Sequence, residues 1–175
     1  PNTGKSTIFN ELTGARQKIG NWPGVTVDKK VGYVRHNDKD IMIVDLPGTY
    51  SVNARSPEER IVIDYLMENH TDLVVDVVDS SNIERNLFLT LQLLEKGIPL
   101  ILDLNMQDEA KKRGIKIDVK KLENFLGFPV LLTVARDGSS LKNMLNVFTS
   151  ISMEGYGPSE KLQAHIAKAK EIEST

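Results

Sequence analysis

The first seven residues, Pro1-Asn2-Thr3-Gly4-Lys5-Ser6-Thr7, match most of the phosphate-binding loop G-x-x-x-x-G-K-[ST] and lack only its first glycine. Successive backbone N–H groups of such a loop, at the start of a helix, bind the phosphates of a nucleotide. Lys5 is predicted to reach the β- and γ-phosphate oxygens, and Ser6 to ligate Mg²⁺. Because Gly-Lys-Ser also occurs by chance in linkers, this interpretation depends on motifs further along the chain.

A second motif, Asp45-Leu46-Pro47-Gly48, follows the apolar run 41–44. A phosphate-loop NTPase needs an acid at a strand end to hold Mg²⁺ through water, and Asp45 is placed for this role. Gly48 would let its backbone N–H approach the γ-phosphate. Taken alone, the motif is equally typical of a strand that ends in a turn.

A third motif, Asn105-Met106-Gln107-Asp108, follows the apolar run 99–102. Asn105 and Asp108 are predicted to select guanine. The Asp108 carboxylate can accept hydrogen bonds from N1 and N2 of guanine, whereas adenine offers no such pair of donors. The Met106 side chain can cover one face of the base. Alone, this motif is also typical of a helix cap, but the three motifs in this order predict a GTP site.

Composition and charge are consistent with one catalytic domain. The chain has 175 residues, with 22 basic and 24 acidic side chains and no cysteine. The balance of charge gives no broad basic surface for nucleic acid, and the absence of cysteine excludes disulfides and thiolate metal sites. No apolar run approaches the roughly 18 residues of a membrane span, so we expect this stretch to be soluble.

Strand and helix patterns alternate along the chain. We expect a polar loop from the end of the first helix to about residue 29, and a hairpin of strands 31–36 and 41–45 joined by 37–40. A capping box at 56–59 begins the second helix. The expected strands are 31–36, 41–45, 73–79, 99–105 and 129–135, and the main expected helices are 5–13, 56–70, 83–96, 139–153 and 159–173. Shorter helical segments end at Gly114 and Gly127.

This pattern predicts an α/β fold, doubly wound, with a mostly parallel sheet and one antiparallel hairpin strand. A phosphate loop normally follows a strand, in this fold a central one flanked by strands 41–45 and 73–79. Because the loop begins at Pro1, we expect that first strand to be missing from the given chain, and the 41–45 and 73–79 strands not to pair directly.

The chain resembles the cytosolic G domain of the ferrous iron transport protein B family, whose members are inner-membrane iron transporters of bacteria and archaea. The resemblance is carried by PNTGKSTIFNELTG, GNWPGVTVDKK, DLPGTYS, VVDSSNIERNLFLTLQLLEKGIP and NMQDEA. It implies a Ras-like phosphate-loop GTPase fold, with GTP hydrolysis by a G domain over 1–154 and the start of a helical spacer over 155–175. It also implies a C-terminal permease domain and a place on the cytoplasmic face of the membrane.

The resemblance also assigns residues. It places the first switch on Gly24-Val25-Thr26-Val27-Asp28, where Thr26 would ligate Mg²⁺ and sense the γ-phosphate. It places the base-closing loop on Val134-Ala135-Arg136, and it implies that Asn2 binds K⁺ beside the phosphates. Asn2 could instead be a simple turn former. The expected partners are GTP and GDP and the permease of the same protein, with self-association left open and no nucleic acid.

Several alternatives stay open at this point. Trp22 either anchors its loop to the domain, which we favour, or stacks on the base. Thr49 follows Gly48 where many small GTPases carry a glutamine, and because Thr is too short to orient water we expect slow hydrolysis. Asp76 and Asp103 interrupt apolar strands, and we expect an exposed or hydrogen-bonded site for each. A GTP-dependent switch in ribosome or RNA assembly and a nucleotide sensor that does not hydrolyse GTP are the competing functions.

Overall fold

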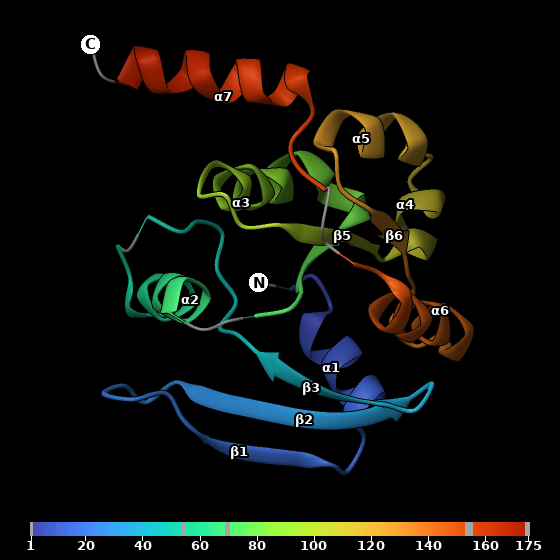
Figure 1. The fold of residues 1–175 in the computed structure, drawn as a ribbon. Coiled ribbons are helices and arrows are strands. Elements are labelled where there is room, and N and C mark those ends of the chain that lie inside the picture. Colours follow the sequence, from blue (N-terminus) through green and yellow to red (C-terminus); the bar gives the residue numbers. More distant parts are fainter. Residues whose placement is uncertain (1, 54, 69–70, 153–155, 174–175) are drawn as a thin grey trace.

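The computed structural model describes residues 2–53, 55–68, 71–152 and 156–173 and contains two three-stranded sheets (Figure 1). The antiparallel sheet has the order β1 (Gln17–Asn21), β2 (Asp28–His36) and β3 (Lys39–Asp45), and the parallel sheet has the order β4 (Val74–Asp79), β5 (Leu100–Asn105) and β6 (Val130–Leu132). The helices are α1 (Lys5–Thr13), α2 (Pro57–Glu68), the 3₁₀ turn η1 (Ser80–Asn82), α3 (Ile83–Glu95), α4 (Gln107–Lys112), α5 (Val119–Leu126), α6 (Gly138–Ser150) and α7 (Glu160–Glu173). The α/β class predicted from the sequence is confirmed.

The parallel sheet lies at the centre of the core because its middle strand is covered on both faces. All six residues of β5 are buried. Leu100, Leu102 and Leu104 point to the face covered by α3 and α5, whereas Ile101 packs with residues of α1 and α6. A central parallel strand with helices on both faces is typically a nearly continuous run of apolar residues. Strand β5 fits this pattern apart from its polar positions 103 and 105.

The antiparallel sheet is larger than the predicted hairpin. The segment predicted as a polar loop contains β1, which pairs with β2 from Gln17 opposite Gly32 to Asn21 opposite Asp28. The prediction of a loop was wrong because four of the five β1 residues are exposed, so the strand shows no apolar alternation. Its backbone hydrogen bonds to the edge of β2 are what make it a strand.

Two other predicted boundaries need correction. Residues Asn37 and Asp38 alone form the β2–β3 turn, with φ of 48° and 58°, the positive values of a two-residue hairpin turn. The last strand ends at Leu132, three residues earlier than predicted, so the base-closing loop 134–136 lies outside the sheet.

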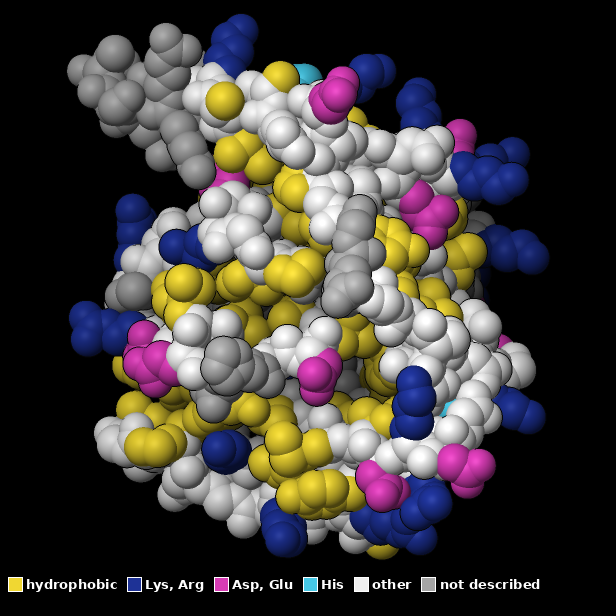
Figure 2. Space-filling model, in the orientation of Figure 1, with side chains coloured by type: hydrophobic (Ala, Val, Ile, Leu, Met, Phe, Trp, Pro, Cys, Tyr) yellow, Lys and Arg dark blue, Asp and Glu magenta, His cyan; other side chains and the backbone are white. Residues whose placement is uncertain are grey.

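The antiparallel sheet is fastened to the rest of the molecule by α1 and α6. A Cβ atom at Gly32 would lie 2.2 Å from the Thr13 side chain, so only glycine lets α1 approach β2 so closely. At the hairpin tip the Asn37 amide donates to the Thr149 hydroxyl at 3.1 Å. Figure 2 shows hydrophobic side chains gathered over this sheet, and Ile19, Tyr33 and Met42 are its exposed large ones.

Strands β3 and β4 are edge strands of different sheets, and the prediction that they do not pair directly is confirmed. Figure 1 shows α1 and the N-terminal end between the two sheets. Lys5, at the start of α1, contacts Asp45 at the end of β3, so the residues of the first two motifs lie together.

The last helix packs on the domain instead of standing apart from it. Leu162 of α7 is buried in the main core cluster, and the Ser159 hydroxyl donates to the Phe125 carbonyl of α5. The expected division into a G domain, 1–154, and a spacer, 155–175, stays a prediction, since residues 153–155 lie outside the described part of the chain. None of the described helices has the length and apolar character that a membrane span would need.

Candidate nucleotide site

The phosphate loop has the backbone geometry that its sequence predicts. Gly4 precedes α1 with a φ of 84°, a conformation that favours glycine, and α1 begins at Lys5. Ser6 is exposed and Thr7 half-buried in the first turn, while Thr3 is buried. Asn2 is exposed with a φ of 62°. Pro1 lies outside the described residues. Gly4 makes no side-chain cap to α1, and the first N–H groups of a helix have no partner within the helix, which favours an anion at this end.

The first and second motifs meet through an ion pair. The Lys5 ammonium donates to the Asp45 carboxylate at the end of β3, and the side chains are 33% and 9% exposed. Residues predicted to bind phosphate and to hold a metal ion thus lie side by side, although they are 40 positions apart in the sequence. Ser6 follows Lys5 directly in the sequence. The Ser6 hydroxyl and the Asp45 carboxylate, oxygen ligands of the kind that Mg²⁺ prefers, therefore belong to neighbouring parts of the structure.

Asn105 connects the phosphate loop to the base-closing loop. Its side-chain amide, 1% exposed, donates to the Thr3 carbonyl at 2.8 Å and accepts from the Ala135 N–H at 3.0 Å. A Cβ atom at Gly4 would lie 2.2 Å from Asn105 Nδ2, which explains why glycine is required there. The sequence predicted a base-selecting role for this residue, and the structure adds that it fixes the two loops relative to each other.

The remaining residues of the third motif lie at the same end of the parallel sheet. Met106 has a φ of 59° and lies directly before α4, and Asp108 is exposed in the first turn of that helix. Gln107 donates through its side chain to the Ser80 hydroxyl at 2.6 Å, which joins α4 to η1. Val134 and Ala135 are half-buried and Arg136 is exposed. The structure therefore brings together the carboxyl ends of β4, β5 and β6, where α/β sheets bind ligands.

The predicted first switch is not part of this cluster. Residues 24–28 follow β1 and lead into β2, and Thr26 is exposed at the end of that hairpin. Within the described ranges Thr26 makes no hydrogen bond to Ser6 or Asp45. Trp22, in the same loop, is 5% exposed and packs edge-on against Tyr65 of α2, with ring centroids 5.4 Å apart. The structure therefore favours the anchoring role of Trp22.

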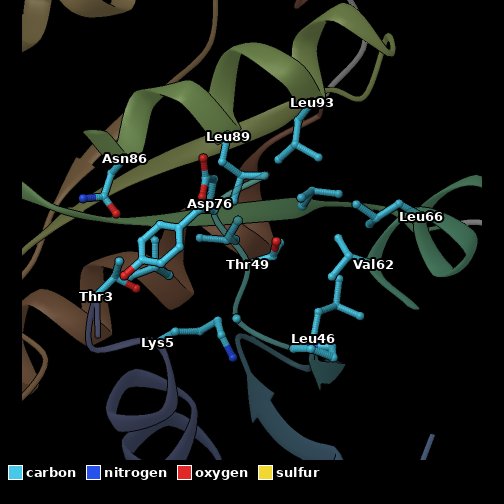
Figure 3. Close-up of a pocket in the computed structure, with 16 residues that line it drawn as sticks. Thr3, Lys5, Leu46, Thr49, Val62, Leu66, Asp76, Asn86, Leu89 and Leu93 are labelled. Carbon is cyan, nitrogen blue, oxygen red and sulfur yellow. The ribbon is translucent and has the colours of Figure 1, made fainter. Parts of the chain in front are cut away.

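The segment after β3 borders a pocket beside the phosphate loop (Figure 3). Half-buried Leu46, Pro47 and Thr49 and exposed Gly48 lie along it. The Thr49 hydroxyl donates to the Ser51 carbonyl at 2.6 Å, so it is engaged within its own turn. Leucine and valine side chains from α2, β4 and α3 form most of the remaining lining. Because this lining is mostly apolar, the pocket itself does not suit phosphates.

Asp76 and Asp103 are both buried and hydrogen-bonded, so of the two alternatives, an exposed or a hydrogen-bonded site, the second is confirmed. Asp76 accepts from the Thr90 hydroxyl of α3 at 2.6 Å, and Asp103 from the Thr133 hydroxyl at 2.9 and 3.0 Å. Burial raises the pKa of Asp76 to about 6 and that of Asp103 to about 7. The bonds from the two threonines lower each pKa, and the charge of Asp76 adds to the rise at Asp103.

Sequence reasoning missed the two threonine partners. Thr133 and Thr90 are 2% and 0% exposed, and each satisfies a buried carboxyl group from another element. An aspartate inside an apolar strand does signal that a donor must be nearby, since an unpaired buried carboxylate is costly. Which donor it is depends on strand register and helix placement, which the sequence does not display.

The parallel sheet flanked by helices, the glycine-dependent phosphate loop and the two linked motifs define the P-loop GTPase fold. The model of the family described as ferrous iron transport protein B matches residues 1–148. The chain therefore belongs to the ferrous iron transport protein B family.

Individual relatives agree with this assignment. The Fe(2+) transporter FeoB of Salmonella typhimurium is 50% identical over 146 residues, which are 81% of this chain and 19% of that protein. The chain thus spans about a fifth of the length of the curated relatives it matches. The cytosolic domain of L. pneumophila FeoB is 41% identical, with a TM-score of 0.84 over 91% of this chain and 70% of that chain. The cytosolic domain of T. maritima FeoB in its GMPPNP form is 40% identical, with a TM-score of 0.85 over 98% and 70%.

Proposed function

We propose that this chain binds and hydrolyses GTP and that its nucleotide state controls Fe²⁺ uptake by a membrane permease in the same protein. The observation that carries the proposal is the junction of the three motifs: Lys5 pairs with Asp45, and Asn105 joins Thr3 to Ala135. The GMPPNP form of the T. maritima relative supports guanine nucleotide binding at such a junction. The names of the full-length relatives support iron as the cargo.

In this proposal each motif has a separate task. The amides of residues 2–7 and the Lys5 ammonium stabilise phosphate charge, and Lys5 leaves Asp45 when phosphate arrives. Ser6, directly, and Asp45, through water, would hold Mg²⁺, which would supply positive charge against the phosphates. The exposure of Ser6 and the position of Asp45 beside Lys5 fit this donor set. Asp108 reads the guanine edge.

The remaining tasks fall to Thr26, which lies away from the junction in this structure, and to Gly48 and Asn2. Thr26 would complete the Mg²⁺ site when the 24–28 loop closes, and the backbone of Gly48 would then sense the γ-phosphate. Exposed Asn2 would hold K⁺ at the phosphates and supply positive charge there. Because Thr49 is held in its own turn and is too short to orient water, hydrolysis is proposed to be slow.

Phosphate release from GTP and ATP, measured with Mg²⁺ and K⁺ present, tests this function. GTP should be hydrolysed and ATP should not. Lys5→Ala should lower the rate about 100-fold or more, as loss of a preorganised charge-stabilising group does. Lys142→Ala, which changes an exposed lysine of α6, is the matched control and should leave the rate unchanged. Equal hydrolysis of ATP and GTP would contradict the proposal.

A further inference from the structure

A relay of buried hydrogen bonds leads from Asp103, through Thr133 and Asn105, to both nucleotide loops. The Thr133 hydroxyl lies 2.9 and 3.0 Å from the two Asp103 oxygens and 3.2 Å from Asn105 Oδ1. Asn105 in turn binds the Thr3 carbonyl and the Ala135 N–H. The three linking side chains are between 0% and 2% exposed, so water does not compete for these bonds. In the described part of the chain, the side-chain hydrogen bonds of Asp103 go to Thr133 and not directly to either loop.

The hydrogen bonds of this relay can point in two directions, depending on the protonation of Asp103. The Thr133 hydroxyl has one proton and can give it to Asp103 or to Asn105, but not to both. The orientation of Asn105 is fixed by its other two bonds, so its Oδ1 must face Thr133. If Asp103 is ionised, it accepts a hydrogen bond from the Thr133 hydroxyl. The Thr133 Oγ1 and Asn105 Oδ1 atoms, both acceptors, then face each other at 3.2 Å with no proton between them. If Asp103 is neutral, it donates to Thr133, and Thr133 donates to Asn105.

We propose that Asp103 is a positioning residue of the nucleotide site, whose neutral carboxyl group acts through Thr133 to hold the Asn105 amide against the phosphate and base loops. The proposal rests on the guanine nucleotide binding proposed above and adds how this site is regulated. Ionisation of Asp103 withdraws one hydrogen bond from Asn105, loosens its hold on Thr3 and Ala135 and lowers nucleotide affinity.

The surroundings of Asp103 favour a change of protonation near neutral pH. Its neighbours on this face of the parallel sheet are the apolar side chains of Ile101 and Leu131 and those of α1 and α6 packed on them. Of the described titratable groups, Asp76 of the adjacent strand is the one whose charge acts on it, and this raises its pKa further. The pKa of about 7 therefore places the two arrangements within the ordinary pH range.

Guanine nucleotide affinity between pH 6 and 8 tests the proposal, with a fluorescent GDP as the probe. Wild-type affinity should fall about threefold to tenfold as the pH rises. Asp103→Asn and Asp103→Ala should keep the high affinity at pH 8, because Thr133 then donates to Asn105 at every pH. Thr133→Val should show the low affinity throughout. Asp72→Asn, which changes an exposed carboxylate near β4, should follow the wild type. Comparison with this control cancels ionisation of the nucleotide itself.

A second measurement does not depend on nucleotide. The backbone N–H of Ala135 should show an NMR shift with the same midpoint as the Asp103 carboxyl carbon, and Thr133→Val should abolish it. If the Ala135 signal does not follow Asp103, or if the Asp103 variants keep the wild-type pH profile of affinity, the relay is wrong. If GDP does not bind at any pH while Ala135 still titrates, the proposed function fails and the coupling of Asp103 to the loops stands.

Discussion

Substitution of Asp76 by asparagine should stabilise the protein at high pH and not at low pH. Asp76 is 7% exposed on β4, and its carboxyl group accepts the Thr90 hydroxyl. Burial raises its pKa from the usual 3.8 to about 6 in spite of this hydrogen bond. Asparagine keeps an acceptor for Thr90 and carries no charge, so it imitates the protonated carboxyl group that the folded state prefers.

The sign and size of the effect follow from proton linkage. Between the two pKa values the folded protein binds a proton that the unfolded chain has lost, so the free energy of unfolding falls as the pH rises through this window. Below pH 3.8 both states are protonated and no penalty exists, and above pH 6 it is fully present. A rise of about two pH units corresponds to about 3 kcal/mol, which is the stabilisation expected for Asp76→Asn at pH 8.

Urea unfolding of the wild type and of Asp76→Asn at pH 4.5 and pH 8 measures this difference. At pH 4.5 most unfolded chains have already lost this proton, so the two proteins should differ by about 1 kcal/mol there and by about 3 kcal/mol at pH 8. Asp72→Asn is the control, because Asp72 is exposed in the loop before β4. A difference that is the same at both pH values, or an Asp76→Asn variant that is less stable at pH 8, would refute the reasoning.

Three further predictions concern the nucleotide site. Asp108→Asn should weaken GTP binding by about 2–4 kcal/mol and strengthen binding of xanthosine triphosphate, and equal wild-type affinity for ATP and GTP in a titration would remove its basis. Asn2→Ala should erase the advantage of K⁺ over Na⁺ in hydrolysis at equal ionic strength, and a difference that persists in the variant would assign K⁺ elsewhere. Thr49→Ala should change hydrolysis by less than about tenfold, whereas a loss near 100-fold would show a catalytic role.

The sequence alone determined the class of protein and predicted the residues of its candidate site. The spacing of Lys5, Asp45 and Asp108 after their respective elements predicted a phosphate loop and a guanine edge, because local backbone requirements impose these residue types. Gly4 is an example, since its positive φ depends on the turn into α1 and is visible in the motif. The helices α1, α2 and α3 were predicted within a few residues because amphipathic periodicity and capping residues are local signals.

Strand β1 was not predictable in the same way. Its residues carry no apolar alternation, and it becomes a strand because the edge of β2 offers unpaired backbone groups. The residues of β1 do not indicate this edge, because the partner strand β2 is a separate segment of the sequence.

Only the tertiary structure decided what the buried polar residues do. Asn105 was read as a base contact, and its second role as the tie between two loops depends on contacts 102 and 30 residues away. Asp103 is satisfied by Thr133, 30 residues away, and Asp76 by Thr90 of α3. A buried carboxyl group needs a hydrogen-bond partner, so an aspartate within an apolar strand predicts from the sequence that one is present. The identity of that donor, and with it the direction of the hydrogen bonds around the site, is set by strand register and helix packing.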